Sequence, residues 1–266
     1  MQQSLLWQIQ HSQHDWTSYV FGTMHVKNDR FFEQLERVYQ AIDSCHFFAA
    51  EYDFHDQTDV ADPSVFRLPE GRTLQDYLTD KRYRKLQRIL RKAFQVDLDH
   101  VQHILPLFVV NLITQQILDQ NQSVSLDEHL WQYALKQGKE GVGVEKLSEQ
   151  TKILQQIPIE EQVNMLRKIG KNVSNFRQQL LHTAEVYQSG DITKLYQMTK
   201  KSTGKMRKVL LYRRNKIMAM RIQEWHKQQS VCAAIGAAHL AGGKGVLRYL
   251  KQQGFRMQPI ALDVRK

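Results

Sequence analysis

The chain has 266 residues, of which 42% are hydrophobic and 24% are charged. This is a globular composition, and the length allows a core to be buried without disulfide or metal staples. The longest apolar stretch, ILPLFVVNLI, is interrupted by Pro106 and Asn111 and is too short to predict a transmembrane helix. The formal net charge of +10 favours an anionic partner.

The positive charge is concentrated in two runs, residues 81–92 and 200–216. Both runs fit helices with solvated cationic faces, and we favour that interpretation over contact with an anionic surface, which stays open as the alternative. No aromatic RNA-binding motif, zinc finger or glycine-rich phosphate loop is visible, so we expect no nucleic-acid partner.

The two cysteines, Cys45 and Cys232, lie in apolar runs, which is typical of buried thiols rather than of a disulfide. No signal peptide is visible, so we expect a soluble protein. Export to the periplasm or beyond stays open if a leader has been removed. The sequence indicates neither the location nor the oligomeric state.

The first 54 residues predict the order β-β-α-β. The runs SLLWQIQ and WTSYVFG flank a polar turn, HSQHD, and favour a hairpin. After the loop TMHVKND, apolar residues at helical spacing predict a helix with Asp29 as its N-cap. The run HFFAAEYDF is continuously apolar and ends in carboxylates, which is typical of a buried strand.

Residues 73–229 read as mostly helical, apart from a glycine-rich strand candidate at 138–145 that follows a helix capped by Ser125. The C-terminus returns to strand (SVCAAIG), loop, helix and strand (FRMQPIALDV). We therefore expect one domain over 1–266 with an α/β (α+β) fold. Its central mixed sheet is built from 1–55 and 230–266, and residues 73–229 form a helical cap.

Two matched motifs end strands at opposite ends of the chain. Gly22 precedes His25 in FGTMH, and Gly236 precedes His239 in IGAAH. A glycine lets the backbone turn or approach a ligand closely, and the strand ends of α/β sheets commonly bind ligands. Imidazole is a common metal ligand and general base. If the two strands are neighbours, both histidines emerge at one edge of the sheet.

Glu51 ends a third apolar strand, where a buried carboxylate needs a metal, a cation or a raised pKa. It could bind a metal beside the histidines or activate water. The structural alternatives are that the histidines only form hydrogen bonds that support the fold, and that Glu51 pairs with a core arginine such as Arg30. From the pattern alone, a shared site and these alternatives are equally supported.

At these residues the sequence resembles the TraB/GumN family, whose animal relatives include the Tiki proteins. The resemblance covers most of the chain and rests on the two G-x-x-H blocks with a glutamate between them. The stretch SLDEHLWQYALKQGKEGVGVEKLSEQ is similar to the family's middle motif, with Asp127, Glu145 and Gln150 at recognisable positions. YQSGDITKL and the RRN of residues 213–215 also fit.

The resemblance implies a fold similar to erythromycin esterase and ChaN-like proteins and a metallohydrolase site. His25, Glu51 and His239 would bind a divalent metal such as manganese, cobalt or zinc and carry the catalysis. Arg30 matches a family arginine and would stabilise oxyanion charge. The supporting residues are Gly22, Gly236, Asp127 and Glu145.

Our first hypothesis is a metal-dependent hydrolase that acts on peptides, or on another small-molecule substrate. The second is a metal-independent, esterase-like hydrolase in which one histidine is the general base and Glu51 tunes it. The third is a non-enzymatic protein that binds a peptide or haem, where haem is suggested only by the ChaN likeness.

Overall fold

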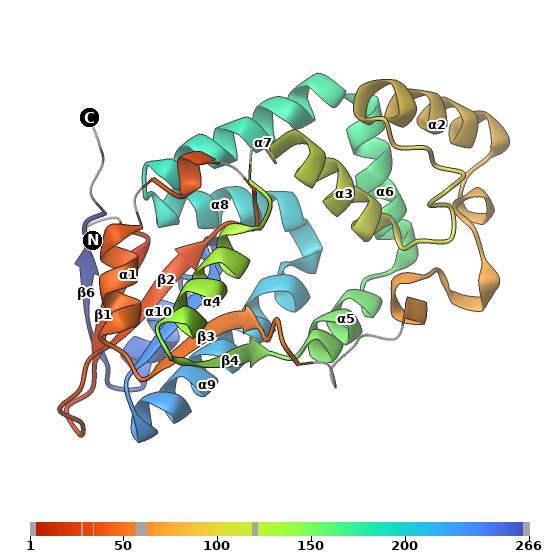
Figure 1. Ribbon diagram of the computed structural model, residues 1–266. Helices are drawn as coiled ribbons and strands as arrows, with labels where there is room; N and C mark the ends of the chain where they lie inside the picture. The colour runs from red at the N-terminus through yellow and green to blue at the C-terminus, as the bar shows by residue number, and fades with distance from the viewer. Residues whose placement is uncertain (1–3, 28, 34, 57–62, 119–121, 263–266) are drawn as a thin grey trace.

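The computed structural model describes residues 4–27, 29–33, 35–56, 63–118 and 122–262 (Figure 1). The chain is built around a six-stranded sheet. In spatial order its strands are β4 (Glu140–Glu145), β3 (Phe47–Tyr52), β5 (Val231–Gly236), β2 (Ser18–Thr23), β1 (Leu6–Gln10) and β6 (Arg256–Ile260). β4, β3, β5 and β2 run parallel, whereas β1 is antiparallel to both β2 and β6, so the sheet is mixed.

Ten α-helices are present in the described residues. They are α1 (Glu36–Asp43), α2 (Asp80–Phe94), α3 (Pro106–Leu118), α4 (Leu126–Lys136), α5 (Leu147–Gln155), α6 (Ile159–Lys171), α7 (Val173–Gln188), α8 (Ile192–Thr203), α9 (Arg214–Gln228) and α10 (Val246–Gln252). None of the described helices is long and apolar enough to cross a membrane.

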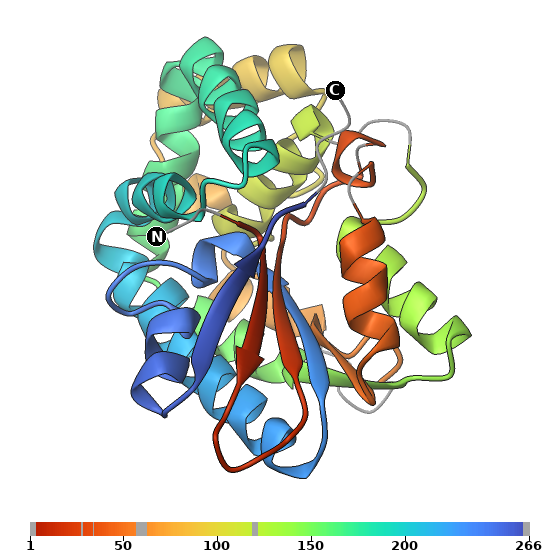
Figure 2. The same ribbon diagram turned by 90° about the vertical axis from the view of Figure 1, so that its left-hand side faces the viewer.

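The sheet is covered on both faces. α1 and α4 pack on one face, and α9 and α10 lie over the other (Figure 2). This is why β5 reads VCAAIG, with its first five residues all buried, because a central parallel strand with helices on both sides has no solvent face. The α/β class and the mixed central sheet are confirmed.

The helical cap has an apolar core of its own. Buried side chains on α2, α3 and α6 form a cluster that is separate from the one around the sheet, for example Leu90, Ile113 and Leu166. In Figure 1 this cap lies at the opposite end of the molecule from β6. The assignment of all 266 residues to a single domain stays a prediction.

The middle of the chain contributes more to the sheet than we expected. β4 pairs with β3 as an edge strand, and α4 and α9 pack on the sheet rather than in the cap. The physical reason is that the outer edge of β3 has backbone donors and acceptors that need partners. Val144 of β4 is fully buried beneath these helices.

The predicted hairpin and one of the two predicted helix caps are present in the structure. The hairpin of β1 and β2 is confirmed, and the Ser125 side chain caps α4 by accepting from the Glu128 amide at 3.3 Å. The N-cap assignment of Asp29 is wrong, because Asp29 begins a short 3-10 turn and α1 begins only at Glu36. Polar capping residues are also favoured in turns, so the signal at Asp29 did not distinguish the two.

We expect the substitution Gly22→Ala to destabilise the protein. A Cβ at Gly22 would lie 2.7 Å from Leu240 Cδ1 and 3.0 Å from Ala237 Cα, so β2 and the turn after β5 would have to separate. Overpacking of this kind lowers the free energy of unfolding by about 1–3 kcal/mol. Thermal unfolding would record it as a Tm lower by roughly 2–4 °C for each kcal/mol.

Gly243→Ala is the matched control, because a Cβ at Gly243 would meet no atom of the described residues within 4 Å. Its Tm should stay close to that of the parent protein. Equal Tm values for the two variants would contradict the close approach assigned to Gly22.

Candidate functional site

Four neighbouring parallel strands end at the same edge of the sheet, and each delivers one polar side chain there. Glu51 lies near the end of β3, and Glu145 is the last residue of β4. His25 follows β2 by two residues, and His239 closes the 3-10 turn directly after β5. The carboxyl ends of parallel strands are where α/β sheets bind ligands. The structure thus brings His25, Glu51 and His239 together, and their catalytic roles stay predictions.

His25 is held between two carboxylates. Its Nδ1 lies 2.8 Å from Asp127 Oδ2, and its Nε2 lies 3.4 Å from Glu51 Oε2. Asp127 belongs to α4 and is itself fixed by Thr23, whose hydroxyl donates to Asp127 Oδ1 at 2.6 Å. Asp127, helped by Glu51, raises the pKa of His25 well above its ordinary value against the opposing effect of burial. The side chain is 48% exposed, so solvent reaches the site here.

Glu51 and Glu145 share one arginine. Arg214, the first residue of α9, donates from Nε to both Glu145 oxygens, at 3.1 and 2.9 Å, and its Nη2 bonds to Glu51 Oε1. The side chains of Arg214, Glu51 and Glu145 are only 14%, 7% and 1% exposed. The second Glu51 oxygen, Oε2, accepts from the Gly236 amide at 3.0 Å.

These contacts decide the charge states at the strand ends. Burial raises the pKa of Glu51, but Arg214 and the imidazoles outweigh it, so the pKa lies well below its ordinary value. For Glu145 burial dominates over the same guanidinium, and its pKa is raised. Burial opposes the charge on Arg214, yet the two carboxylates raise its pKa. Glu51 is therefore the ionised carboxylate that faces the histidines.

His239 is buried and neutral, and its tautomer is set by Asn215. Asn215 donates from Nδ2 to the Lys244 carbonyl at 2.6 Å, so its Oδ1 faces His239 Nδ1 at 2.5 Å. The proton must therefore sit on Nδ1, which leaves a lone pair on Nε2. Burial and the nearby Arg214 charge lower the pKa of His239 to about 3.

Gly236 explains how the second motif brings these groups together. A Cβ at this position would lie 3.2 Å from Glu51 Oε2 and 3.3 Å from His239 Cδ2. Glu51 and His239 therefore both pack against the bare Cα of Gly236. Any larger residue would enter the space between the carboxylate and the imidazole.

The donor set fits a divalent metal in its chemistry. Each histidine has Nδ1 engaged by an acceptor, Asp127 or Asn215, which is the usual outer support of a metal-binding imidazole. Two imidazole nitrogens and a carboxylate suit a metal such as zinc, manganese or cobalt. In the described part of the chain, however, no group of three or more His, Cys, Asp or Glu side chains is already arranged to hold an ion. The ligand types and the groups that orient the imidazoles therefore suit a metal, but the described side chains do not form a complete coordination site.

Sequence reasoning identified part of this arrangement. Asp127 and Glu145, proposed as supporting residues, contact His25 and Arg214. The side chain of Arg30 lies outside the described residues, and the arginine that pairs with Glu51 is Arg214. Arg214 and Asn215 were missed as functional residues, although both belong to the RRN segment. Their only signal was that resemblance, because helical residues far along the chain carry no spacing relation to the strand ends.

Comparisons with known proteins agree with the motifs. The family model of the TraB/PrgY/gumN family matches residues 5–259, which confirms the predicted resemblance. A Danio rerio protein named Metalloprotease TIKI2 is 24% identical over 324 aligned positions, which cover 96% of this chain. The chain spans 60% of the length of that curated relative. No solved structure matches significantly, so the likeness to erythromycin esterase and ChaN-like folds stays a prediction.

We expect Arg214→Met to destabilise the fold strongly. The substitution leaves Glu51 and Glu145 buried without their counter-charge, and breaking a buried ion pair in this way lowers the free energy of unfolding by about 3–5 kcal/mol. Adding Glu145→Gln to the variant should recover part of the loss, because one of the two stranded carboxylates becomes neutral. Urea unfolding measures both effects.

The adjacent Arg213 is the matched control. It is exposed and donates to the Gln156 side chain at 3.0 Å. Arg213→Met should change the free energy of unfolding by less than about 0.5 kcal/mol. Similar losses for the two arginines would contradict the role assigned to Arg214.

Proposed function

We propose that this chain, which belongs to the TraB/PrgY/gumN family, is a metal-dependent hydrolase that cleaves peptide bonds. The observation that carries the proposal is the pair of imidazoles beside Glu51, each with Nδ1 engaged by a different acceptor. The substrate class rests on the name of the TIKI2 relative, which is a metalloprotease.

In this proposal His25, His239 and Glu51 would hold the metal. Such an ion supplies Lewis-acid polarisation of the scissile carbonyl and lowers the pKa of a water molecule. Asp127 and Asn215 orient the two imidazoles through their Nδ1 atoms, so both rings are prepared before a substrate arrives.

The protein's own groups also control protons and charge. Glu51 stays ionised because Arg214 faces it, so its oxygens can accept a hydrogen bond from an attacking water. Arg214 adds a fixed positive charge behind the carboxylates. Arg30 keeps the proposed role of stabilising oxyanion charge, although its side chain lies outside the described residues.

A metal-independent hydrolase is the second candidate, and two observations favour it. Arg214 already compensates the negative charge of Glu51. His239 is neutral and oriented by Asn215, which is the arrangement of a general base with its orienting partner. In this version Nε2 of His239 takes a proton from water directly.

We expect His239→Ala and His25→Ala each to reduce peptide hydrolysis at least about 100-fold, the lower end of the loss when a positioned acid or base is removed. Cleavage of a peptide library, read by mass spectrometry, measures this, with circular dichroism as the check on folding. His182→Ala is the control, because His182 is exposed on α7 and pairs with Glu185. Undiminished cleavage by either site variant would refute the hydrolytic site.

Removal of metal separates the two candidates. We expect dialysis against a chelator to abolish hydrolysis, and Mn²⁺, Co²⁺ or Zn²⁺ to restore it. We also expect Asn215→Ala to weaken metal affinity about 10–100-fold, since it frees the His239 ring. Elemental analysis and isothermal titration measure these effects. Full activity in protein shown to be metal-free would instead favour the metal-independent candidate.

A further inference from the structure

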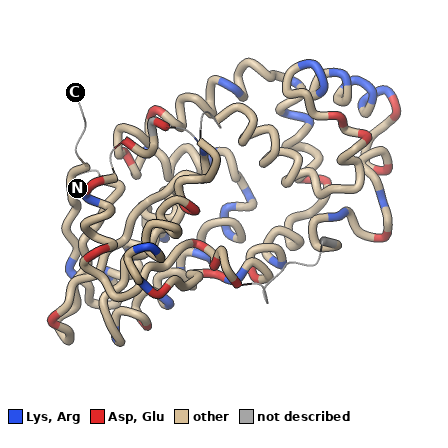
Figure 3. Tube along the Cα trace, in the orientation of Figure 1, with Lys and Arg blue, Asp and Glu red and all other residues tan. Residues whose placement is uncertain are grey.

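Helix α2 has an unusual distribution of charge. Its buried face is apolar, with Tyr83, Leu86, Leu90 and Phe94 packed into the core of the cap. After Asp80, every exposed residue of the helix is a cation: Lys81, Arg82, Arg84, Lys85, Arg88, Arg91 and Lys92. Figure 3 shows this concentration of positive charge at the end of the cap.

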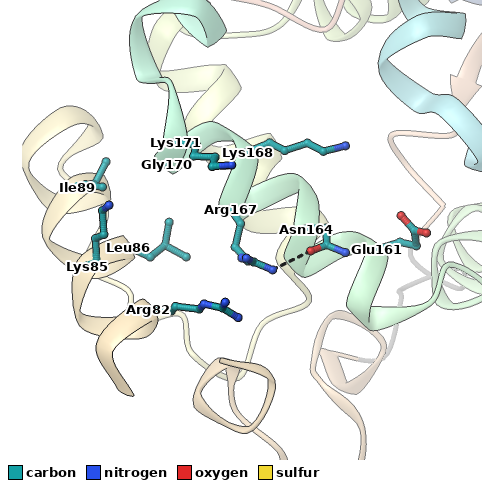
Figure 4. Close-up of a pocket in the computed structure, with 10 residues that line it drawn as sticks. All are labelled: Arg82, Lys85, Leu86, Ile89, Glu161, Asn164, Arg167, Lys168, Gly170 and Lys171. Atoms are coloured by element: carbon teal, nitrogen blue, oxygen red, sulfur yellow. Dashed lines mark hydrogen bonds between the residues drawn. The ribbon is translucent and has the colours of Figure 1, made fainter. Parts of the chain in front are cut away.

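Helix α6 extends the cationic surface across a cleft. The cleft has a volume of about 600 Å³ and lies between α2 and α6. Its cations are Arg82 and Lys85 on α2 and Arg167, Lys168 and Lys171 on α6. Figure 4 shows Arg82 and Leu86 projecting from α2 toward α6, and Arg167 projecting from α6 into the same space. We call these cations, together with the exposed cations of α2, the basic face.

The basic face lacks internal compensation. Among the described residues, no ion pair joins any of its cations to a carboxylate. Arg167 donates to the neutral Asn164 side chain, and the acidic groups lining the cleft and the adjoining hollow are Glu161 and Asp80. Uncompensated like charges repel one another and destabilise the compact state. An external polyanion would relieve this repulsion.

Shape and chemistry select among polyanions. Between Lys81 and Lys92 the helix rises by roughly 16 Å, so its cations form a line that a single phosphate group could not engage. No aromatic side chain of the described residues lines the cleft, so bases have no ring on which to stack, as they do in proteins that bind single-stranded nucleic acids. It is lined instead by Leu86 and Ile89, which lie beneath the charges. Clusters of four to eight cations on an amphipathic helix are typical of binding to acidic phospholipids.

We propose that the basic face docks on a membrane surface rich in acidic phospholipids. Phosphate headgroups contact the cations of α2 and α6, and the long aliphatic stems of these cations cover Leu86 and Ile89. The cap carries α2 at the end of the molecule remote from β6 (Figure 1). The proposed docking does not depend on the proposed hydrolysis.

Co-sedimentation with vesicles tests the proposal on the full chain. We expect binding to phosphatidylcholine vesicles that contain phosphatidylglycerol, no binding to phosphatidylcholine alone, and loss of binding in high salt because screening shortens the reach of the charges. The triple variant Arg82→Gln, Lys85→Gln, Arg88→Gln should lower the partition constant about tenfold or more. These positions are exposed, so circular dichroism should be unchanged.

A charge-matched triple variant on α8 is the control. Lys194→Gln, Lys200→Gln, Lys201→Gln removes the same charge from exposed positions outside the basic face, and it should lower the partition constant less than about twofold. Equal losses for the two triple variants would overturn the proposal in favour of an effect of net charge. Equal binding to the two vesicle types, or no binding to either, would also overturn it. Tighter binding of duplex DNA than of acidic vesicles would assign the face to nucleic acid.

Discussion

The ion pairs of Arg214 are the constraint on which the strand-end site depends. Two carboxylates, Glu51 and Glu145, lie near the ends of neighbouring strands and have almost no contact with water. Buried carboxylates of this kind need a counter-charge, and α9 supplies a single guanidinium that bonds to both. Arg214 bonds to both carboxylates, but the pKa of Glu51 is lowered whereas burial raises the pKa of Glu145. The carboxylate that stays ionised is therefore Glu51, which lies beside the histidines. A π-helical stretch, Lys208–Arg213, leads directly into this position.

Strand order determines which side chains can meet there. β5 is inserted between β3 and β2, so the last part of the chain lies between two of the first strands. Thr23 pairs with Gly236 across β2 and β5, and this register brings the two G-x-x-H blocks side by side although they are about 200 residues apart. The glycines then serve a packing purpose, since each occupies a place where a Cβ would collide with the opposite block or with the site itself.

The cap and the sheet carry different arrangements of charge. Its own apolar core makes α2, α3 and α6 a compact unit, so the exposed face of α2 can be specialised without disturbing the sheet. The charges on that face and the charges at the strand ends differ in whether they are paired. At the strand ends the buried charges of Glu51, Glu145 and Arg214 pair with one another. On α2, no ion pair joins an exposed cation to a carboxylate of the described residues. Paired, buried charges are suited to the proposed hydrolytic site, and unpaired, exposed cations are suited to the proposed anionic surface.

The sequence by itself determined the class of fold and identified three candidate side chains for the strand-end site. Alternation, apolar runs and the spacing from glycine to histidine are local properties, so they could be recognised without coordinates. They made His25, Glu51 and His239 candidates, and the family resemblance favoured a shared site. Only the tertiary structure decided the partners of these groups. Asp127 and Asn215 orient the imidazoles, and Arg214 compensates the charge of the ionised Glu51. All three come from helices with no fixed spacing to the strands. The tertiary structure also decided the edge position of β4, because strand pairing depends on which edge of the sheet is open and not on the residues of the strand alone.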